Sequence, residues 1–143
     1  MTLLDLKPST IDIDFTGPYD DIAEFNKIQK GIPHGFNIDT WTDGMVFSQG
    51  LPEDYLRKSI AVKTKLKRIN LRALHPIDIV VTKIGRLNER DAQDIELCIR
   101  KFKVKKSQIS KRANMVQYAG NEMAYANKLE YVLKSFFARK LKK

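Results

Sequence analysis

Two aspartates one residue apart are the side chains of this sequence that most directly suggest chemistry. Asp12 and Asp14 lie in the segment 9–15, Ser-Thr-Ile-Asp-Ile-Asp-Phe, where apolar and polar residues alternate. This period of two predicts a half-buried β-strand with both carboxylates on one face. Such neighbours lie about 6.5–7 Å apart and repel each other unless a cation binds them. Paired divalent ions catalyse nucleotidyl transfer; the alternative is a strand whose polar face is only solvated.

A third candidate carboxylate, Asp39, lies in a second alternating segment, 36–41. Between the two segments, Gly17 and Pro18 predict the start of a helix that ends near Gly31. The apolar stripe predicted to be buried comprises Ile22, Phe25, Ile28 and Ile32. A strand–helix–strand order would bring an acid from each strand to one site. The alternative for Asp39 is an aspartate that only flanks the turn at residues 43–44.

Length and composition indicate one folded α/β domain. The chain has 143 residues, of which 43% are hydrophobic, enough for a core. No run of 18 apolar residues is present, which argues against a membrane span. The first 15 residues lack the apolar stretch of a signal peptide. The single cysteine, Cys98, excludes an internal disulfide, suits a reducing cytoplasmic compartment and is predicted to pack in a helix.

Charge is distributed unevenly along the chain. Residues 1–60 carry 5 Lys/Arg and 10 Asp/Glu, residues 61–100 carry 9 and 5, and residues 101–143 carry 12 and 2. An acidic first part and a basic tail suit a protein that binds metal at one place and attracts nucleic acid, nucleotide or tRNA at another. The alternative is a solvated pair of basic helices without a ligand.

The middle of the chain predicts a short helix followed by two strands. The helix begins within 51–56, and the strands cover 60–66 and 68–74. The first of these strands has three lysines on one face: Lys63, Lys65 and Lys67. Lysines in this arrangement either protect the edge of a sheet or contact a polyanion, and edge protection is favoured.

Two helices joined by a turn follow, the first over 76–87. In the second helix, Asp91 and Asp94 lie on one side, and Arg90 precedes Asp94 by the four residues that favour pairing. Lys83, in an otherwise apolar helix, must extend to solvent or meet an anion. An ion-paired elbow that locks the two helices accounts for these residues without a ligand.

The tail predicts two more helices. Ser107 is the expected cap of the first, which would end near Gly120. The second has an apolar stripe of Tyr125, Leu129, Val132, Leu133, Phe136, Phe137 and Leu141. Its basic border consists of Lys134, Arg139, Lys140, Lys142 and Lys143. A stripe this broad predicts packing on the body of the protein, or on a second copy in a homodimer.

Three segments together resemble the nucleotidyltransferase superfamily: 7–15, 75–83 and 89–94. The nearest likeness is to the AbiEii toxin-like branch and its short relatives. Members carry a basic residue and Ser or Thr before an Asp-x-Asp strand. They later carry Pro-x-Asp-x-x-x-x-Lys on a helix, and then Arg-Asp-x-x-Asp. The likeness covers roughly residues 5–100 and extends in outline to the helical tail.

The resemblance implies roles for nine residues. Asp12, Asp14 and Asp39 would bind Mg²⁺ or Mn²⁺, with Asp39 as ligand or base. The residues that would bind or line the nucleotide and its phosphates are Ser9, Thr10, Lys83, Arg90, Asp91 and Asp94. In this chemistry a metal-activated hydroxyl attacks the α-phosphate of a nucleoside triphosphate, and pyrophosphate leaves.

The sequence departs from the family in one motif. The Gly-Gly or Gly-Ser turn that cradles phosphates before the first acidic strand has no counterpart, because Gly17 is the first glycine. Either the motif precedes this sequence or the lineage keeps the fold without transfer activity.

The expectation is an α/β (α+β) fold: a small mixed nucleotidyltransferase-like sheet flanked by helices in residues 1–104, and a basic helical extension in 105–143 packed on it. The expected function is metal-dependent transfer of a nucleotide from a nucleoside triphosphate to an RNA, tRNA or protein hydroxyl, of a toxin type with a cognate antitoxin. The alternative is an inactive module of the same fold that binds nucleic acid or a protein through its basic tail.

Overall fold

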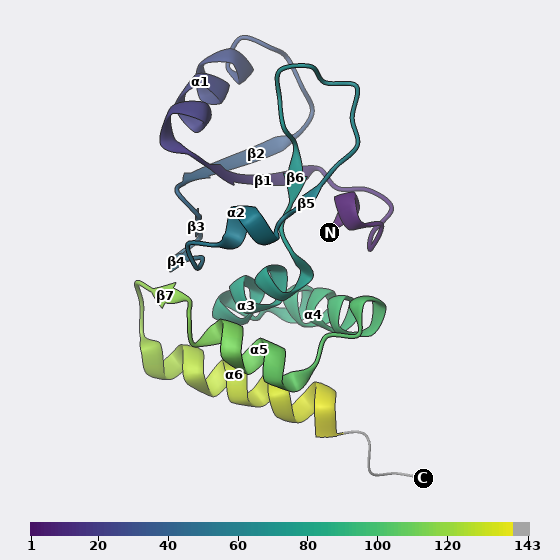
Figure 1. Cartoon of the computed structure of the whole chain (residues 1–143), viewed down its shortest axis with the longest axis vertical. Helices are drawn as coiled ribbons and strands as arrows, with labels where there is room; N and C mark the ends of the chain where they lie inside the picture. The colour runs from purple at the N-terminus through teal and green to yellow at the C-terminus, as the bar shows by residue number, and fades with distance from the viewer. Residues whose placement is uncertain (139–143) are drawn as a thin grey trace.

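The acid-bearing segments form a strand–helix–strand unit at one end of the molecule (Figure 1), in a computed structural model that describes residues 1–138. Its elements are β1 (Asp12–Gly17), α1 (Tyr19–Gln29) and β2 (Asn37–Thr42), and the two strands are parallel. Helix α1 covers one face of the pair: the rings of Phe15 and Phe25 are 5.1 Å apart, and the Asn26 amide donates to Thr40 Oγ1 at 2.9 Å. The acids are therefore on the opposite face, as the alternation predicts.

Two details of this unit differ from the sequence-based expectation. Strand β1 begins at Asp12 instead of Ser9, because the Thr10 hydroxyl accepts the Asp12 amide at 3.1 Å and forms a local turn. Ile11 is consequently exposed. The buried stripe of α1 is also shorter than predicted, since Ile28 and Ile32 are 55% and 56% exposed. A pair of strands is too narrow to cover the whole helix.

The middle of the chain contains short strands and one short helix. They are β3 (Met45–Val46), β4 (Gln49–Gly50), α2 (Tyr55–Lys58), β5 (Ile60–Ala61) and β6 (Arg72–Ala73). Strands β3 and β4 form an antiparallel sheet with β7 (Gln117–Tyr118), and β5 pairs with β6. The strands predicted over 60–66 and 68–74 form only as β5 and β6, so their predicted extent was wrong. Pairing stops after two residues, and a loop follows. The lysines of this loop alternate with Thr64 and Leu66, and its apolar residues Leu66 and Ile69 are exposed.

Four helices form the other end of the molecule (Figure 1). They are α3 (Pro76–Arg86), α4 (Glu89–Phe102), α5 (Lys106–Ala113) and α6 (Glu122–Phe137). Helix α4 begins with a capping box in which Asn88 and Asp91 bind each other's backbone amides. The predicted Ser107 cap was wrong: α5 begins one residue earlier and ends at Ala113, and β7 follows. A short 3₁₀ turn, Thr2–Leu4, precedes β1.

The hydrophobic core lies mainly among α3–α6 and includes residues from both sides of position 104. Its fully buried members include Val80, Val81, Ile84, Ile95, Cys98, Ile109 and Val132. The last helix packs on the body, where the Tyr125 hydroxyl donates to the Val81 carbonyl at 2.9 Å. Burial raises the pKa of the Cys98 thiol to about 11, as suits a packing residue. Within residues 12–42, by contrast, Ile22 is the only buried large hydrophobic residue.

A buried ion-pair cluster joins three parts of this end of the molecule. The guanidinium of Arg112, on α5, donates to both Asp78 oxygens, on α3, at 2.5 and 3.0 Å. Its Nη1 also donates to Asp54 Oδ1 at 2.5 Å. Asp78 is fully buried and Arg112 is 5% exposed. The cluster therefore fixes α5 against α3 and against the segment that leads into α2.

The C-terminal predictions are only partly covered by the structure. Lys134 is exposed and pairs with Glu130 at 2.6 Å. Leu141 of the apolar stripe and four members of its basic border, Arg139, Lys140, Lys142 and Lys143, lie outside the described residues. No helix within residues 1–138 combines the length and the apolar character of a membrane-spanning segment.

Candidate functional site

The open face of the β1–β2 pair brings the three predicted acids, Asp12, Asp14 and Asp39, onto one surface. We call this surface the acid face. Asp14 is directly opposite Asp39, and Asp12 is opposite Asn37. In register, such neighbours are separated by the strand spacing of about 4.8 Å. The amide of Asn37 donates to Asp12 Oδ1 at 2.9 Å. The pKa of Asp14 is raised, first because the surrounding protein removes part of its hydration and next because the Asp39 carboxylate repels its charge.

The acids fit a magnesium ion that is held jointly with a ligand. Within residues 1–138, no three His, Cys, Asp or Glu side chains are arranged as a complete metal site. Mg²⁺, however, usually binds one or two protein carboxylates and completes its shell with waters and substrate phosphates. Asp14 and Asp39 provide such a pair of hard oxygen donors. Asp12 would add a third after releasing Asn37.

An ion-paired elbow joins α3 and α4 and faces the acids. Lys83 Nζ lies 3.0 Å from Asp91 Oδ1 and 2.9 Å from Asp94 Oδ2. Arg86 makes a two-pronged contact with Asp91, through Nε at 2.7 Å and Nη2 at 2.8 Å. Lys7, which precedes β1, reaches Asp94 Oδ1 at 2.6 Å. Both carboxylates are almost fully buried, so the cations that surround them hold the two helices together.

One ion pair predicted for this elbow, between Arg90 and Asp94, is absent from the described residues. Arg90 was expected to pair with Asp94 across one helical turn, yet its side chain is exposed and no carboxylate of residues 1–138 lies within 4 Å of it. Arg86 provides the guanidinium instead. It lies across the turn from Asp91, a relation that helical spacing does not reveal. Its position three residues after Lys83, on one side of α3, was the available sequence signal.

Because of the buried Asp91, the free energy of unfolding should depend on pH in the acidic range. Burial alone would raise its pKa, but hydrogen bonds from Arg86 and Lys83 lower it to about 2. A carboxyl group whose pKa is lower in the folded state contributes stability above its unfolded value, and that contribution disappears as pH falls through the folded pKa. We expect the free energy of unfolding to fall by about 2 kcal/mol between about pH 5 and pH 2 on account of this group.

Urea unfolding at several pH values measures this effect. In Asp91→Asn, which has no carboxyl group to protonate at this position, the loss of stability over that interval should be smaller by about the same amount. The exposed Asp21 on α1 offers a matched control, because Asp21→Asn should keep the wild-type pH dependence. Equal pH profiles for wild type and Asp91→Asn would contradict this interpretation of the elbow.

Two aromatic residues place Arg86 next to the acid face. Trp41, two residues after Asp39 and on the same face of β2, packs edge-on against Phe47 with ring centres 5.0 Å apart. The Arg86 guanidinium lies 4.5 Å from the centre of the Phe47 ring. The positive charges of Arg86 and Lys83 partly offset the rise in the pKa of Asp14 that lost hydration and Asp39 cause. The acids, the aromatic pair and the elbow therefore form one continuous site.

A close approach between β4 and α3 fixes this arrangement. A Cβ atom at Gly85 would lie 2.0 Å from Gln49 Nε2, so only glycine admits the buried Gln49 side chain. Gln49 Nε2 donates to the Thr82 carbonyl at 2.7 Å. The contact holds the turn between β3 and β4 against α3, which positions Phe47 over Arg86. Phe47 itself has a left-handed backbone, with φ at 56°, a strained conformation for an aromatic residue.

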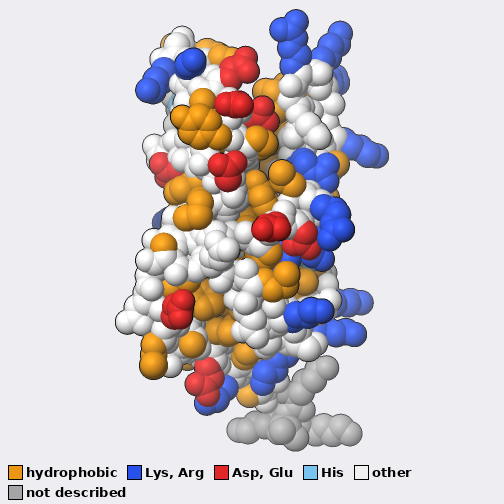
Figure 2. All heavy atoms as spheres, turned by 60° about the vertical axis from the view of Figure 1, so that its left-hand side comes forward, with side chains coloured by type: hydrophobic (Ala, Val, Ile, Leu, Met, Phe, Trp, Pro, Cys, Tyr) orange, Lys and Arg blue, Asp and Glu red, His pale blue; other side chains and the backbone are white. Residues whose placement is uncertain are grey.

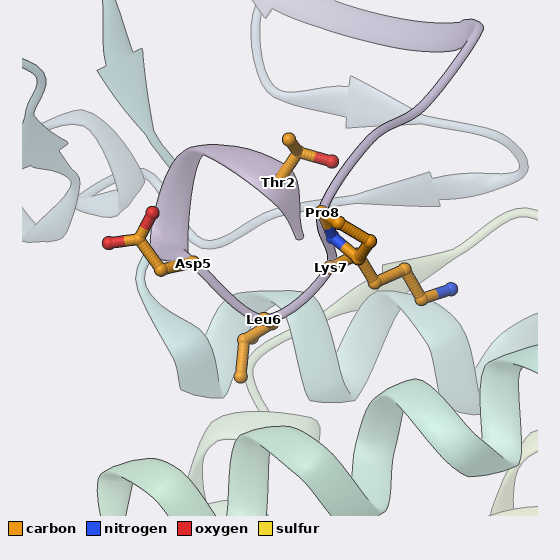
Figure 3. Close-up of a pocket in the computed structure, with 5 residues that line it drawn as sticks. All are labelled: Thr2, Asp5, Leu6, Lys7 and Pro8. Carbon is orange, nitrogen blue, oxygen red and sulfur yellow. The ribbon is translucent and has the colours of Figure 1, made fainter.

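The segment before β1 contributes a separate hollow. Figure 3 shows its lining residues, Thr2, Asp5, Leu6, Lys7 and Pro8, with Leu6 directed toward the helices and Lys7 extending away from Asp5. Lys101 fixes this segment by donating to the carbonyls of Leu4 and Asp5 at 2.9 and 3.0 Å. Ser9 and Thr10 follow directly, ahead of β1. Neither the acids nor the elbow carboxylates line this hollow.

One comparison with known proteins identifies a family for this chain. A family described as "Nucleotidyltransferase of unknown function (DUF6036)" matches residues 3–137. The match includes the acid face, the aromatic pair and the elbow. The comparisons with curated proteins and with solved structures give no match. The AbiEii branch stays a prediction, since this match does not identify it. Because the family match covers almost the whole sequence, the chain belongs to this nucleotidyltransferase family.

Proposed function

We propose that this chain is a metal-dependent nucleotidyltransferase that transfers a nucleotide from a nucleoside triphosphate to a hydroxyl of an RNA, tRNA or protein. The observation that supports the proposal best is the pair of facing carboxylates, Asp14 and Asp39, opposite a cationic elbow. The pKa of Asp14 is raised first by lost hydration and next by repulsion from Asp39, and a divalent cation would relieve that repulsion. Mg²⁺ or Mn²⁺, when bound there, would neutralise charge at the α-phosphate.

The protein's own side chains would bind the cation, accept the proton of the attacking hydroxyl and bind phosphate. Asp14, joined by Asp12, holds the cation, and Asp39 serves either as the facing ligand or as base for the attacking hydroxyl. Lys83 is 17% exposed and shared between two buried carboxylates, so it is the less available cation. Arg86 is 44% exposed and uses Nε and Nη2 on Asp91. Its Nη1 group remains oriented by that contact to bind a phosphate oxygen.

A second candidate function is an inactive module of the same fold that binds nucleic acid or a partner protein. It is favoured by the segment before β1, where residues 1–11 contain no glycine. Lys101 holds a 3₁₀ turn there, and these eleven residues do not form a glycine-rich phosphate turn. A toxin-type activity restrained by a cognate antitoxin belongs to the first proposal.

Ligand-dependent unfolding separates the two functions. Thermal unfolding of the full chain would be followed with Mg²⁺ or Mn²⁺, with and without each nucleoside triphosphate. A ligand at about 100 times its Kd stabilises the folded state by about 2.7 kcal/mol, a rise in Tm of about 5–10 °C. A shift that requires metal and triphosphate together supports the transferase. If no combination shifts the Tm, the proposal of an active transferase fails for this chain.

A further inference from the structure

The loop between β5 and β6, residues 62–71, is a second charged feature that the acid face and the elbow do not use. We call it the basic arm. Its four cations are Lys63, Lys65, Lys67 and Arg68, all exposed. The surrounding sequence, 55–77, contains seven Lys/Arg and no Asp or Glu. The arm therefore carries a local positive charge that its own segment cannot neutralise.

The positive charge of the arm is also not neutralised by carboxylates from other parts of the described chain. None of its four cations lies within 4 Å of a carboxylate in the described part of the chain. In the elbow, by contrast, Lys83 and Arg86 each pair with a buried aspartate. Exposed cations without a carboxylate within 4 Å are available to an external anion. When such cations neutralise the charges of a polyanion, the counterions condensed on the polyanion are released into solution. This release favours association, most strongly at low salt.

The base of the arm is fixed, although its tip is exposed. Arg72 donates to Ser59 through Nε to Oγ at 2.6 Å and through Nη2 to the carbonyl at 2.7 Å. The Val62 amide donates to the Leu71 carbonyl at 3.0 Å. These bonds close the loop just beyond the paired strands. The arm thus projects from a defined place on the fold and keeps its cations together.

The arm is at the same end of the molecule as the acid face. Figure 1 shows the loop between β5 and β6 rising beside the unit of β1, α1 and β2. In Figure 2, Lys and Arg side chains follow the top and right-hand edge at this end, and others lie at the upper left near Asp and Glu side chains. An acceptor that carries phosphates is repelled by Asp12, Asp14 and Asp39. Cations next to these acids would offset that repulsion and hold such an acceptor nearby.

We propose that the basic arm binds the phosphate backbone of a nucleic acid, which is the acceptor of the transferase. The identification of this nucleic acid as acceptor rests on the proposed function, whereas its binding to the arm does not. Phosphate contacts of this kind position a strand without reading its sequence. The exposed Leu66 and Ile69, 54% and 55% accessible, lie among the cations and would contact sugars or bases.

The test is fluorescence anisotropy of the full chain with a labelled single-stranded RNA, in the absence of metal and triphosphate. The arm variant replaces all four cations, as Lys63→Gln, Lys65→Gln, Lys67→Gln and Arg68→Gln. Four phosphate contacts on a single strand contribute about −2.8 to the slope of log K against log salt. We expect the arm variant to lose about that much of the slope and to bind RNA at least about 100-fold more weakly at low salt.

A matched variant controls for net charge. Lys103→Gln and Lys105→Gln, in the turn between α4 and α5, together with Lys106→Gln and Lys111→Gln on α5, remove the same charge from exposed positions. They should change RNA affinity by less than about threefold. Equal losses in both variants, an unchanged slope in the arm variant, or binding to vesicles of anionic lipid without RNA binding would each overturn the proposal. Failure of the transferase is separate: the Tm would not respond to metal and triphosphate, while the arm-dependent RNA affinity would persist.

Discussion

Asp14→Asn is expected to abolish the joint stabilisation by metal and triphosphate, and to lower nucleotidyl transfer by about 10³-fold. The substitution removes a carboxylate that faces Asp39 and keeps the size of the side chain. Without it, a divalent cation loses one of its two facing protein ligands, and charge at the α-phosphate is no longer offset. Transfer would be followed with a triphosphate labelled at the α-phosphate, and binding by the shift in Tm.

The same variant should not destabilise the unliganded protein. Asp14 is exposed and its pKa is raised by lost hydration and by Asp39, so the neutral amide removes a repulsion instead of a favourable contact. Asp12→Asn should have a smaller effect on transfer, because Asn37 already binds the Asp12 carboxylate. Asp21→Asn, on the exposed side of α1, serves as the unchanged control. Full transfer activity in Asp14→Asn would remove the acid face from the mechanism.

Arg112→Met is expected to lower the free energy of unfolding by about 3–5 kcal/mol, a fall in Tm of about 10–20 °C. The change leaves Asp78 fully buried without its two hydrogen bonds from the guanidinium. Asp54 loses its contact with Nη1 as well. The cost arises from an uncompensated buried charge, and methionine retains most of the side-chain volume. Thermal and urea unfolding measure the effect.

Two further variants identify the cause of this loss. Arg112→Met combined with Asp78→Leu removes both charges, and should recover part of the stability, since apolar side chains often replace a buried ion pair without loss. Arg100→Met breaks an exposed pair with Glu96 and should cost less than about 1 kcal/mol. If Arg112→Met lowers the Tm no more than Arg100→Met does, the cluster contributes little to stability.

The parts of the site that rest on local periodicity could be predicted from the sequence. Alternation between residues 12 and 15 and again between 37 and 41 placed Asp12, Asp14 and Asp39 on one face, and the register of β1 and β2 confirms it. The spacing of Asp91 and Asp94 placed both on one side of α4. Strands and helices repeat with fixed periods, so a face can be predicted before its partner is known. The α+β class was also confirmed, because the same periods distinguish strands from helices along the sequence.

The contacts that complete the site depend on tertiary packing and left little trace in the sequence. Arg86 meets Phe47 because the side chain of Gln49 enters the space left by Gly85. No propensity indicates that these three segments approach one another. The strands predicted over 60–66 and 68–74 failed for a related reason. Their alternation was real, but without an apolar surface to cover them the lysines stayed in solvent, and only two residue pairs formed.

The uneven placement of the core has a consequence for motion. Most buried side chains belong to α3–α6, whereas the unit of β1, α1 and β2 buries little more than Ile22. Cooperative opening of a segment costs less free energy where fewer apolar contacts are lost. Backbone amides of the acid-bearing unit should therefore exchange with deuterium by local opening, while those of α3 await global unfolding. Such opening would let Asp14 and Asp39 adjust their separation if a cation binds there, while the helical end stays folded.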